Sequence, residues 1–283
     1  MWSRNKANLY IRDALDDFHY DPKALPSPIA QRKIYRNKLM LTHLVGFGGG
    51  VSEKIGDVTS YALDGTGDYL SVPDHADWTF GNGNFVVELF IRFDSAGLSN
   101  AQPFYAQRTP PAQWFVNKND TTHKLVMVFV NAGDVEVGRY TMTSNWAVSA
   151  DQWYHLAFTR TTVVGRIFID GVEQTVTEGA AFSTNTVDDL AAELTIGSGW
   201  GAAIDGYIDE IRISKGTDRG WTSGFTPPSS EYVSDANTAL LIHGGEVKSG
   251  TTGSGATFTD SGNTGHTVTE NGNAIEDTTI FKF

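Results

Sequence analysis

A carboxylate within an otherwise apolar strand is the first feature of this sequence that could do chemistry. Residues 206–214 read GYIDEIRIS, and regular alternation along a strand would place Tyr207, Asp209, Ile211 and Ile213 on one face. That face looks apolar, and burying an unpaired carboxylate there would cost several kcal/mol. We therefore expect Asp209 either to bind a metal ion or to be hydrogen-bonded without an ion, and the sequence leaves both alternatives open.

A second group of acids lies in a tight turn early in the chain. Residues 64–68 read Asp-Gly-Thr-Gly-Asp, and their two glycines permit the positive φ angles that tight turns need. This turn separates two predicted strands, so Asp64 and Gly65 are expected at the end of the first of them.

Three tryptophans could bind a sugar ring. Trp146, Trp200 and Trp221 each stand near Gly, Asn or Ser in predicted loops. Sugars stack on exposed aromatic faces, but aromatic residues in loops are also typical of buried anchors, and both interpretations stay open. His155, in contrast, has no second histidine or acid at ligand spacing, and is predicted to be a packed or hydrogen-bonded core residue.

Composition and charge limit the classes of function. The chain of 283 residues is 40% hydrophobic and contains no cysteine, which excludes disulfides and mildly favours folding in a reducing cytoplasm. No run of about 18 apolar residues could span a membrane, and the N-terminus lacks the apolar stretch of a secretion signal. Residues 1–50 hold eight Lys or Arg and four Asp or Glu, which is a net charge of +4. Because the whole chain has a net charge of −12, residues 51–283 carry −16. Because residues 51–283 are so acidic, we expect the protein not to bind nucleic acid.

Repeated short strands predict an all-β protein. In residues 85–93 every second residue is apolar, which predicts a strand. Asp170-Gly171 stands between two runs of β-forming residues, which predicts a hairpin. Strand signals recur from residue 57 to about 214 with scarcely a helix, so we predict a two-sheet antiparallel jelly-roll sandwich over residues 51–245. Residues 1–50 differ in composition, carry a Pro-rich stretch and end in GFGGG, and we expect them to form a separate docking arm.

Several short motifs follow one another in a recognisable order. They are LDG (63–65), GDYLSVPD (67–74), WYHLAFTR (153–160), IFIDG (167–171), LTIG (194–197), GYIDEIRISKG (206–216), FTPP (225–228) and LLIH (240–243). Together they resemble the concanavalin A-like lectin/glucanase superfamily, and more narrowly its laminin G-like, pentraxin-related domains, over about residues 57–245. Close relatives of this pattern are abundant in bacteriophage structural proteins.

The resemblance contains an inversion of order. In the phage modules a segment like residues 240–274 opens the domain, whereas here it stands last. Residues 246–283 are therefore expected to complete a sandwich, either that of their own chain, as in a circular permutation, or that of a neighbouring subunit, by strand exchange. Both arrangements would cover an otherwise bare sheet edge.

The resemblance also implies a metal site. In related domains an aspartate of a late strand helps to bind a structural calcium ion together with backbone carbonyls of the early loop. The matching positions here are Asp209, Asp64 and Gly65. The paired acids of retaining glucanases, in an ExDxxE strand, have no counterpart in this sequence, so we expect no enzymatic activity.

Two functions follow as hypotheses. The first is a non-enzymatic bacteriophage virion protein, docked through residues 1–50 on the capsid as a decoration protein, or on the tail, and displaying the sandwich outward. Its partners would be other virion proteins, in a homo-oligomer or a multi-copy assembly, with no nucleic acid and no membrane. The alternative is a carbohydrate-binding lectin or adhesin that recognises host-surface glycans, with Trp146, Trp200 and Trp221 as the candidate contacts.

Overall fold

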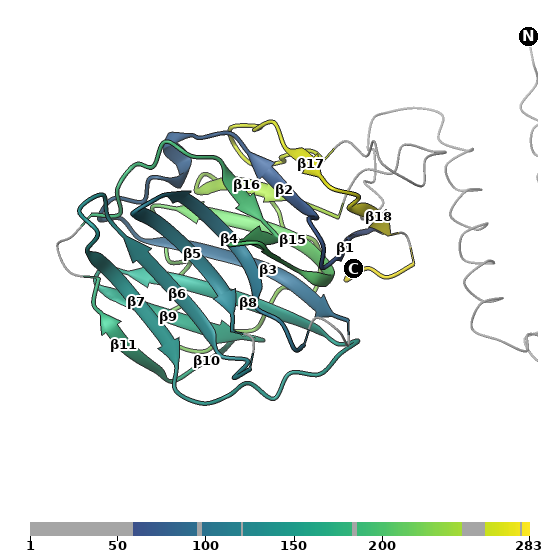
Figure 1. The fold of residues 1–283 in the computed structure, drawn as a ribbon, viewed down its shortest axis with the longest axis horizontal. Helices are drawn as coiled ribbons and strands as arrows, with labels where there is room; N and C mark the ends of the chain where they lie inside the picture. The colour runs from purple at the N-terminus through teal and green to yellow at the C-terminus, as the bar shows by residue number, and fades with distance from the viewer. Residues whose placement is uncertain (1–58, 95–97, 120, 183–185, 245–257, 278) are drawn as a thin grey trace, which may run out of the picture. The chain divides into compact units, whose positions relative to one another are not determined.

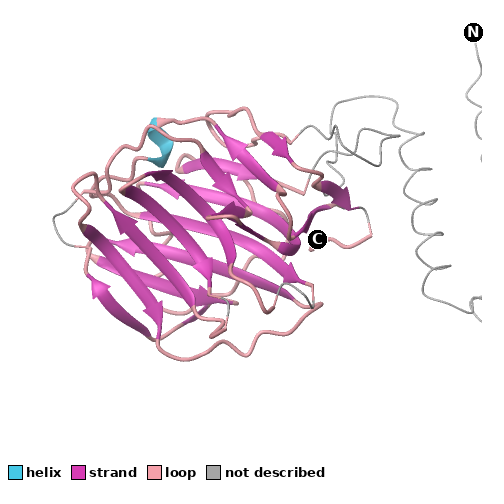
Figure 2. Cartoon of the chain, in the orientation of Figure 1, coloured by secondary structure: helices cyan, strands magenta, loops and turns pink. Residues whose placement is uncertain are grey.

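Two antiparallel sheets make up the described part of the chain. The computed structural model describes residues 59–94, 98–119, 121–182, 186–244, 258–277 and 279–283. The predicted docking arm, residues 1–50, and the first part of the predicted C-terminal segment lie outside these residues. Figure 1 shows the two sheets, and Figure 2 shows that strands dominate, with one short 3₁₀ helix, η1 (Ala76–Trp78). Within the described residues, no helix has the length and apolar character that crossing a membrane requires.

The first sheet, sheet A, places β3 and β15 at its centre. Its order is β10 (Val172–Glu173), β9 (Val164–Ile169), β8 (Trp153–Thr161), β3 (Phe85–Phe93), β15 (Asp205–Lys215), β1 (Ser60–Asp64) and β18 (Ile275–Asp277), with β16 (Thr238–Ile242) also beside β15. The long strand β15 therefore pairs with β3 along one edge and with both β1 and β16 along the other.

The second sheet, sheet B, packs against sheet A. Its order is β11 (Val176–Ala180), β7 (Glu136–Met142), β6 (Leu125–Val130), β5 (Ala112–Lys118), β4 (Gln102–Thr109), β12 (Leu194–Ile196), β2 (Tyr69–Val72) and β17 (Thr269–Asn271). A small hairpin, β13 (Ser198–Gly199) and β14 (Ala202–Ala203), follows β12. The predicted all-β antiparallel sandwich is confirmed.

The core lies between the two sheets and follows the predicted alternation. Phe85, Val87, Leu89, Ile91 and Phe93 of β3 are all fully buried within it. From sheet B, Trp114 and Val116 of β5 reach the same core. Fully burying one such side chain contributes about 1.5–3 kcal/mol, so the alternating strands supply the main driving force for folding.

One prediction about β15 is wrong because the strand contains a β-bulge. Pairing with β3 breaks its register between Asp209 and Arg212, and Glu210 adopts a φ of 50°. The extra residue reverses the alternation, so Ile211 joins Ile208 in the core while Asp209 lies on the opposite, outer face of sheet A. The sequence had placed Asp209 on the same face as Ile211.

The outer face of sheet A is covered by the segment that joins β15 to β16. Tyr232 of this segment packs on Phe90 and Leu241, and Phe283 at the C-terminus joins the cluster. Beneath it, Glu88 accepts hydrogen bonds from Arg212 Nε at 2.8 Å and lies 3.0 Å from His155 Nε2. His155 is fully buried, so the prediction of a hydrogen-bonded core histidine is confirmed.

The final strands lie beside the first strands of the same chain. β17 pairs with β2 in sheet B, and β18 pairs with β1 in sheet A (Figure 1). Residues 269–277 therefore extend both sheets beside the first strands of the same chain.

Candidate functional site

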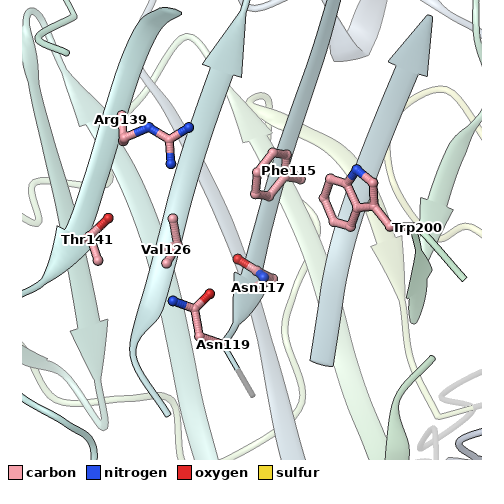
Figure 3. Close-up of a pocket in the computed structure, with 7 residues that line it drawn as sticks. All are labelled: Phe115, Asn117, Asn119, Val126, Arg139, Thr141 and Trp200. Atoms are coloured by element: carbon pink, nitrogen blue, oxygen red, sulfur yellow. The ribbon is translucent and has the colours of Figure 1, made fainter. Parts of the chain in front are cut away.

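A hollow on the outer surface of sheet B collects aromatic and polar side chains. Its volume is about 260 Å³, and Figure 3 shows the residues that line it: Phe115, Asn117, Asn119, Val126, Arg139, Thr141 and Trp200. The hollow follows from strand alternation, because Trp114 and Val116 of β5 point into the core and their neighbours Phe115 and Asn117 therefore point outward.

Strand register brings these outward residues into two rows across the sheet. Phe115 lies opposite Val128, which lies opposite Arg139 on the next strand. In the second row, Asn117 lies opposite Val126, which lies opposite Thr141. Val126 and Val128 are buried in a small apolar cluster on which Phe115 packs, so the partly exposed ends of each row are the groups that a ligand can contact.

Trp200 forms one wall of the hollow. It lies in the turn between β13 and β14 with a φ of 54°, and 43% of its surface is exposed. Its ring meets Phe115 edge to face at 4.2 Å between centroids, and the Arg108 guanidinium lies 4.7 Å from its centroid on the ring face. A positive φ in a residue other than glycine costs about 1–3 kcal/mol, and such strain persists only where surrounding contacts hold it. The indole is therefore held in place rather than left free in a loop.

Polar side chains also line the hollow. Oδ1 of Asn117 is buried and has no hydrogen-bond partner. Arg139 donates from Nε to both carboxylate oxygens of Glu136 at 2.9 Å, and this hydrogen bonding lowers the pKa of Glu136 and raises that of Arg139. An aromatic face beside fixed amide and guanidinium groups suits a ligand that is apolar on one side and polar at its rim.

The other two candidate tryptophans lie elsewhere. Trp146 is 9% exposed and packs edge to face against Phe93 and Tyr154, so its ring belongs to the core. Trp221 stacks on Phe225 with centroids 3.8 Å apart, near His155 on the outer face of sheet A. Of the three, only Trp200 lines the hollow on sheet B.

The predicted metal ligands are not brought together. Asp64 pairs with Asp205 across β1 and β15, whereas Asp209 lies four residues further along, a separation of about 13 Å along the strand. Asp209 is buried, and its carboxyl accepts hydrogen bonds from the backbone N–H of Glu210 at 2.8 Å and of Lys282 at 3.1 Å. Burial and the charge of Glu210 raise its pKa to about 8, so the uncharged acid is the stable form at neutral pH.

A different acidic cluster surrounds Asp64 and Gly65. A second hollow is lined by the carboxyl groups of Asp64, Asp68, Asp94 and Asp205, together with Asn273. The Asp68 carboxylate accepts hydrogen bonds from the backbone N–H groups of Asp64 and Asn273. Burial, together with the charges of Asp94 and Asp64, raises the pKa of Asp205. Sequence reasoning missed Asp205 because only the register of β1 with β15 places it beside Asp64.

Gly65 contributes through its backbone. Its φ is 79°, its N–H donates to the carbonyl of Ile204 at 2.9 Å, and a Cβ at this position would lie 3.1 Å from the Asp205 side chain. Glycine is therefore needed here for the turn and for the close approach of the two segments.

Some known proteins share limited similarity with this chain. No curated protein matches this sequence. Among solved structures, a Bacteroides ovatus protein that has been suggested to bind carbohydrate is 17% identical over 77% of this chain, with a TM-score of 0.49. Domain 4 of the extracellular arabinanase AbnA from Geobacillus stearothermophilus, in complex with arabinotriose, is 21% identical over 63% of this chain, with a TM-score of 0.43. Domains LG4-5 of the mouse laminin α1 chain are 14% identical over 55% of this chain, with a TM-score of 0.41.

The matched regions cover different shares of those proteins. This chain spans 58% of the Bacteroides protein, 82% of the arabinanase domain and 40% of the laminin fragment. The family model described as the concanavalin A-like lectin/glucanases superfamily matches residues 64–217, which is more than half of the chain and runs from the β1–β2 turn to the end of β15. The chain therefore belongs to the laminin G-type branch of the concanavalin A-like lectin/glucanases superfamily.

Proposed function

We propose that this protein binds carbohydrate in the hollow on sheet B. The observation that carries the proposal is the exposed Trp200 ring, fixed against Phe115 at the side of a hollow that polar side chains also line. A sugar ring presents C–H groups on one face and hydroxyl groups at its edge. The first would stack on the indole, and the hydroxyl groups would hydrogen-bond to partly exposed polar side chains of the hollow, such as Asn119 and Thr141.

A glycan array followed by titration of the best ligand tests this proposal. Trp200→Ala keeps a non-glycine residue at the strained position and removes only the ring, so we expect folding to be retained. Affinity should fall by at least tenfold, about 1.4 kcal/mol, because a central aromatic contact is lost. Trp221→Phe is the matched control, since it changes a tryptophan on the other sheet and should leave binding unchanged. The absence of any bound glycan, or equal binding by Trp200→Ala, would contradict the proposal.

The virion role is a proposal about where this sandwich is displayed. It is supported by motifs typical of phage structural proteins and by the segment 240–274, which follows the other motifs instead of preceding them. In this reading the chain is a non-enzymatic component of a capsid or tail, and residues 1–50 dock it on other virion proteins. Incorporation into phage particles, compared between the full chain and a chain lacking residues 1–45, tests the idea. Incorporation of the shortened chain would refute the docking role.

Calcium remains a proposal, with a changed set of ligands. The acidic hollow fits a cation better than the position of Asp209 does, because Asp64, Asp94 and Asp205 line it, and burial together with repulsion from Asp94 and Asp64 raises the pKa of Asp205. Asp64, Asp205 and nearby backbone carbonyls would hold the ion, and it would neutralise this repulsion. Calorimetric titration with Ca²⁺ tests the assignment, and failure to bind would leave the cluster as a set of hydrogen-bond acceptors for turns.

A further inference from the structure

Two histidines and an aspartate converge at a place that neither the glycan hollow nor the acidic hollow includes. His75 and Asp77 come from the loop and 3₁₀ helix that follow β2, and His266 comes from the segment that leads to β17. Among the described residues, this is the one group of three histidine or acidic side chains whose possible ligand atoms all lie within 4.8 Å of one another.

The spacing of the atoms resembles the edges of a metal coordination polyhedron. Oδ2 of Asp77 lies 3.2 Å from Nδ1 of His75 and 2.9 Å from Nε2 of His266. Ligands in a tetrahedral zinc site, at about 2.0–2.1 Å from the metal, are about 3.3–3.4 Å apart. The three atoms therefore need only small shifts to bind one ion.

Hydrogen bonding alone does not satisfy this arrangement. The backbone N–H of Asp77 donates to Nδ1 of His75 at 3.2 Å, so this nitrogen acts as an acceptor. The same nitrogen lies 3.2 Å from the Asp77 carboxylate oxygen, which is also an acceptor. A cation between the two would replace a repulsive contact with two attractive ones, at the expense of one long hydrogen bond.

The surroundings favour a site with an open position. His266 is 7% exposed and packs against the Trp78 ring, whereas 43% of the His75 side chain is exposed. Thr264 donates from Oγ1 to Asp77 Oδ2 at 2.7 Å, which orients the carboxylate as outer-shell partners of metal ligands do. Solvent can therefore supply a fourth ligand on the His75 side.

We propose that His75, Asp77 and His266 bind a Zn²⁺-like transition metal ion that joins the loop after β2 to the C-terminal segment. Two imidazole nitrogens and one carboxylate oxygen favour zinc and its neighbours over calcium, which takes oxygen ligands. Asp77 and His266 are 189 residues apart, so the ion would close a very long loop and hold the segment that carries β17 and β18.

Cobalt and zinc titrations of the full chain, without a polyhistidine tag, test this proposal. Co²⁺ should produce the visible absorption of a low-symmetry nitrogen and oxygen site at one ion per chain, Zn²⁺ should displace it, and Ca²⁺ should not. Zn²⁺ should also raise the unfolding midpoint and slow amide hydrogen exchange in residues 258–268.

Variants separate ligands from bystanders. His75→Ala removes a largely exposed ligand and should abolish stoichiometric binding while the chain stays folded. Thr264→Val should weaken binding by roughly 10- to 100-fold, as loss of an outer-shell partner does. His123→Asn, a histidine in the β5–β6 turn, is the matched control and should bind as the wild type does. No stoichiometric binding, or binding equal in His75→Ala and wild type, would overturn the proposal and leave His266 and Asp77 as a simple hydrogen-bonded pair.

Discussion

Asp209 offers a direct test of how burial sets the protonation of this protein. Its carboxyl is 2% exposed, and its pKa is raised from 3.8 to about 8 by burial first and by the charge of Glu210 second. The backbone hydrogen bonds from Lys282 and Glu210 favour the charged form, but they do not reverse the effect. The folded protein therefore keeps a proton on Asp209 in a pH range where the unfolded chain has lost it.

The sign of the pH effect follows from proton binding. Between about pH 4 and pH 8 the folded state binds more protons than the unfolded state, so this group makes unfolding easier as the pH rises. Each pH unit in that range lowers the free energy of unfolding by about 1.4 kcal/mol, a total of about 5 kcal/mol by pH 8. Below pH 4 both states are protonated at this group and its contribution is constant.

Asp209→Asn removes the titrating group with little change of shape. The amide keeps one acceptor oxygen but turns an NH₂ donor toward one of the two backbone N–H groups, which costs about 1 kcal/mol. At pH 9 the variant should therefore be more stable than the wild type by about 3–4 kcal/mol, whereas at pH 4 it should be equal or slightly less stable. Urea unfolding at several pH values, with an unchanged slope of free energy against denaturant, measures this difference.

Asp235→Asn is the matched control because its shift has the opposite sign. Burial tends to raise the pKa of Asp235, but the hydrogen bonds from Arg219 and Asn237 and the charge of Arg219 lower it overall. Its stabilising effect is therefore present above about pH 4 and lost in acid, so this variant should be less stable at neutral pH. Parallel pH profiles for wild type and Asp209→Asn would refute the reasoning about Asp209.

Two further predictions concern buried and clustered charges. Glu88→Gln should lower the free energy of unfolding at pH 7 by about 3–5 kcal/mol, because it leaves the buried Arg212 guanidinium without its counter-charge. Urea unfolding measures this change, and a decrease below about 1 kcal/mol would contradict the prediction. Asp205→Asn should raise the thermal midpoint in the absence of calcium, since it removes repulsion from Asp64 and Asp94, and should abolish any rise on adding Ca²⁺; a fall in the midpoint without calcium would contradict the repulsion.

The sandwich could be predicted from the sequence because apolar residues alternate along its strands, and this pattern can be recognised one strand at a time. In β3 the residues from Phe85 to Phe93 that alternate as apolar all lie in the core between the sheets, although its outward residues are buried as well. The bulge at Glu210 could not be inferred in this way. Nothing in GYIDEIRIS marks the residue that leaves the ladder, and the positive φ is set by pairing with β3 and by contacts of Glu210 with Tyr232 and His243. The error about Asp209 followed from that one residue.

The candidate sites depend on contacts between distant residues, which limited their prediction. All three tryptophans have similar neighbours in sequence, but Trp146 meets Phe93 in the core and Trp200 meets Phe115 on the surface. Tertiary packing alone makes this distinction. The pairing of Asp64 with Asp205 likewise depends on strand register, which a local pattern does not specify.

The two sheets differ in a way that decides where a ligand can bind. On β3 of sheet A the outward residues are almost all buried, because the segment between β15 and β16 covers them and places Tyr232 on Phe90. On β5 of sheet B buried and partly exposed residues alternate, so its outer face meets solvent. A ligand can bind only to side chains that are exposed to solvent, so a strand that is buried on both faces cannot contribute to a binding surface. The partly exposed side chains of β5 therefore offer a surface to a ligand on sheet B, and Trp200 lies beside it with its ring toward Phe115 (Figure 3).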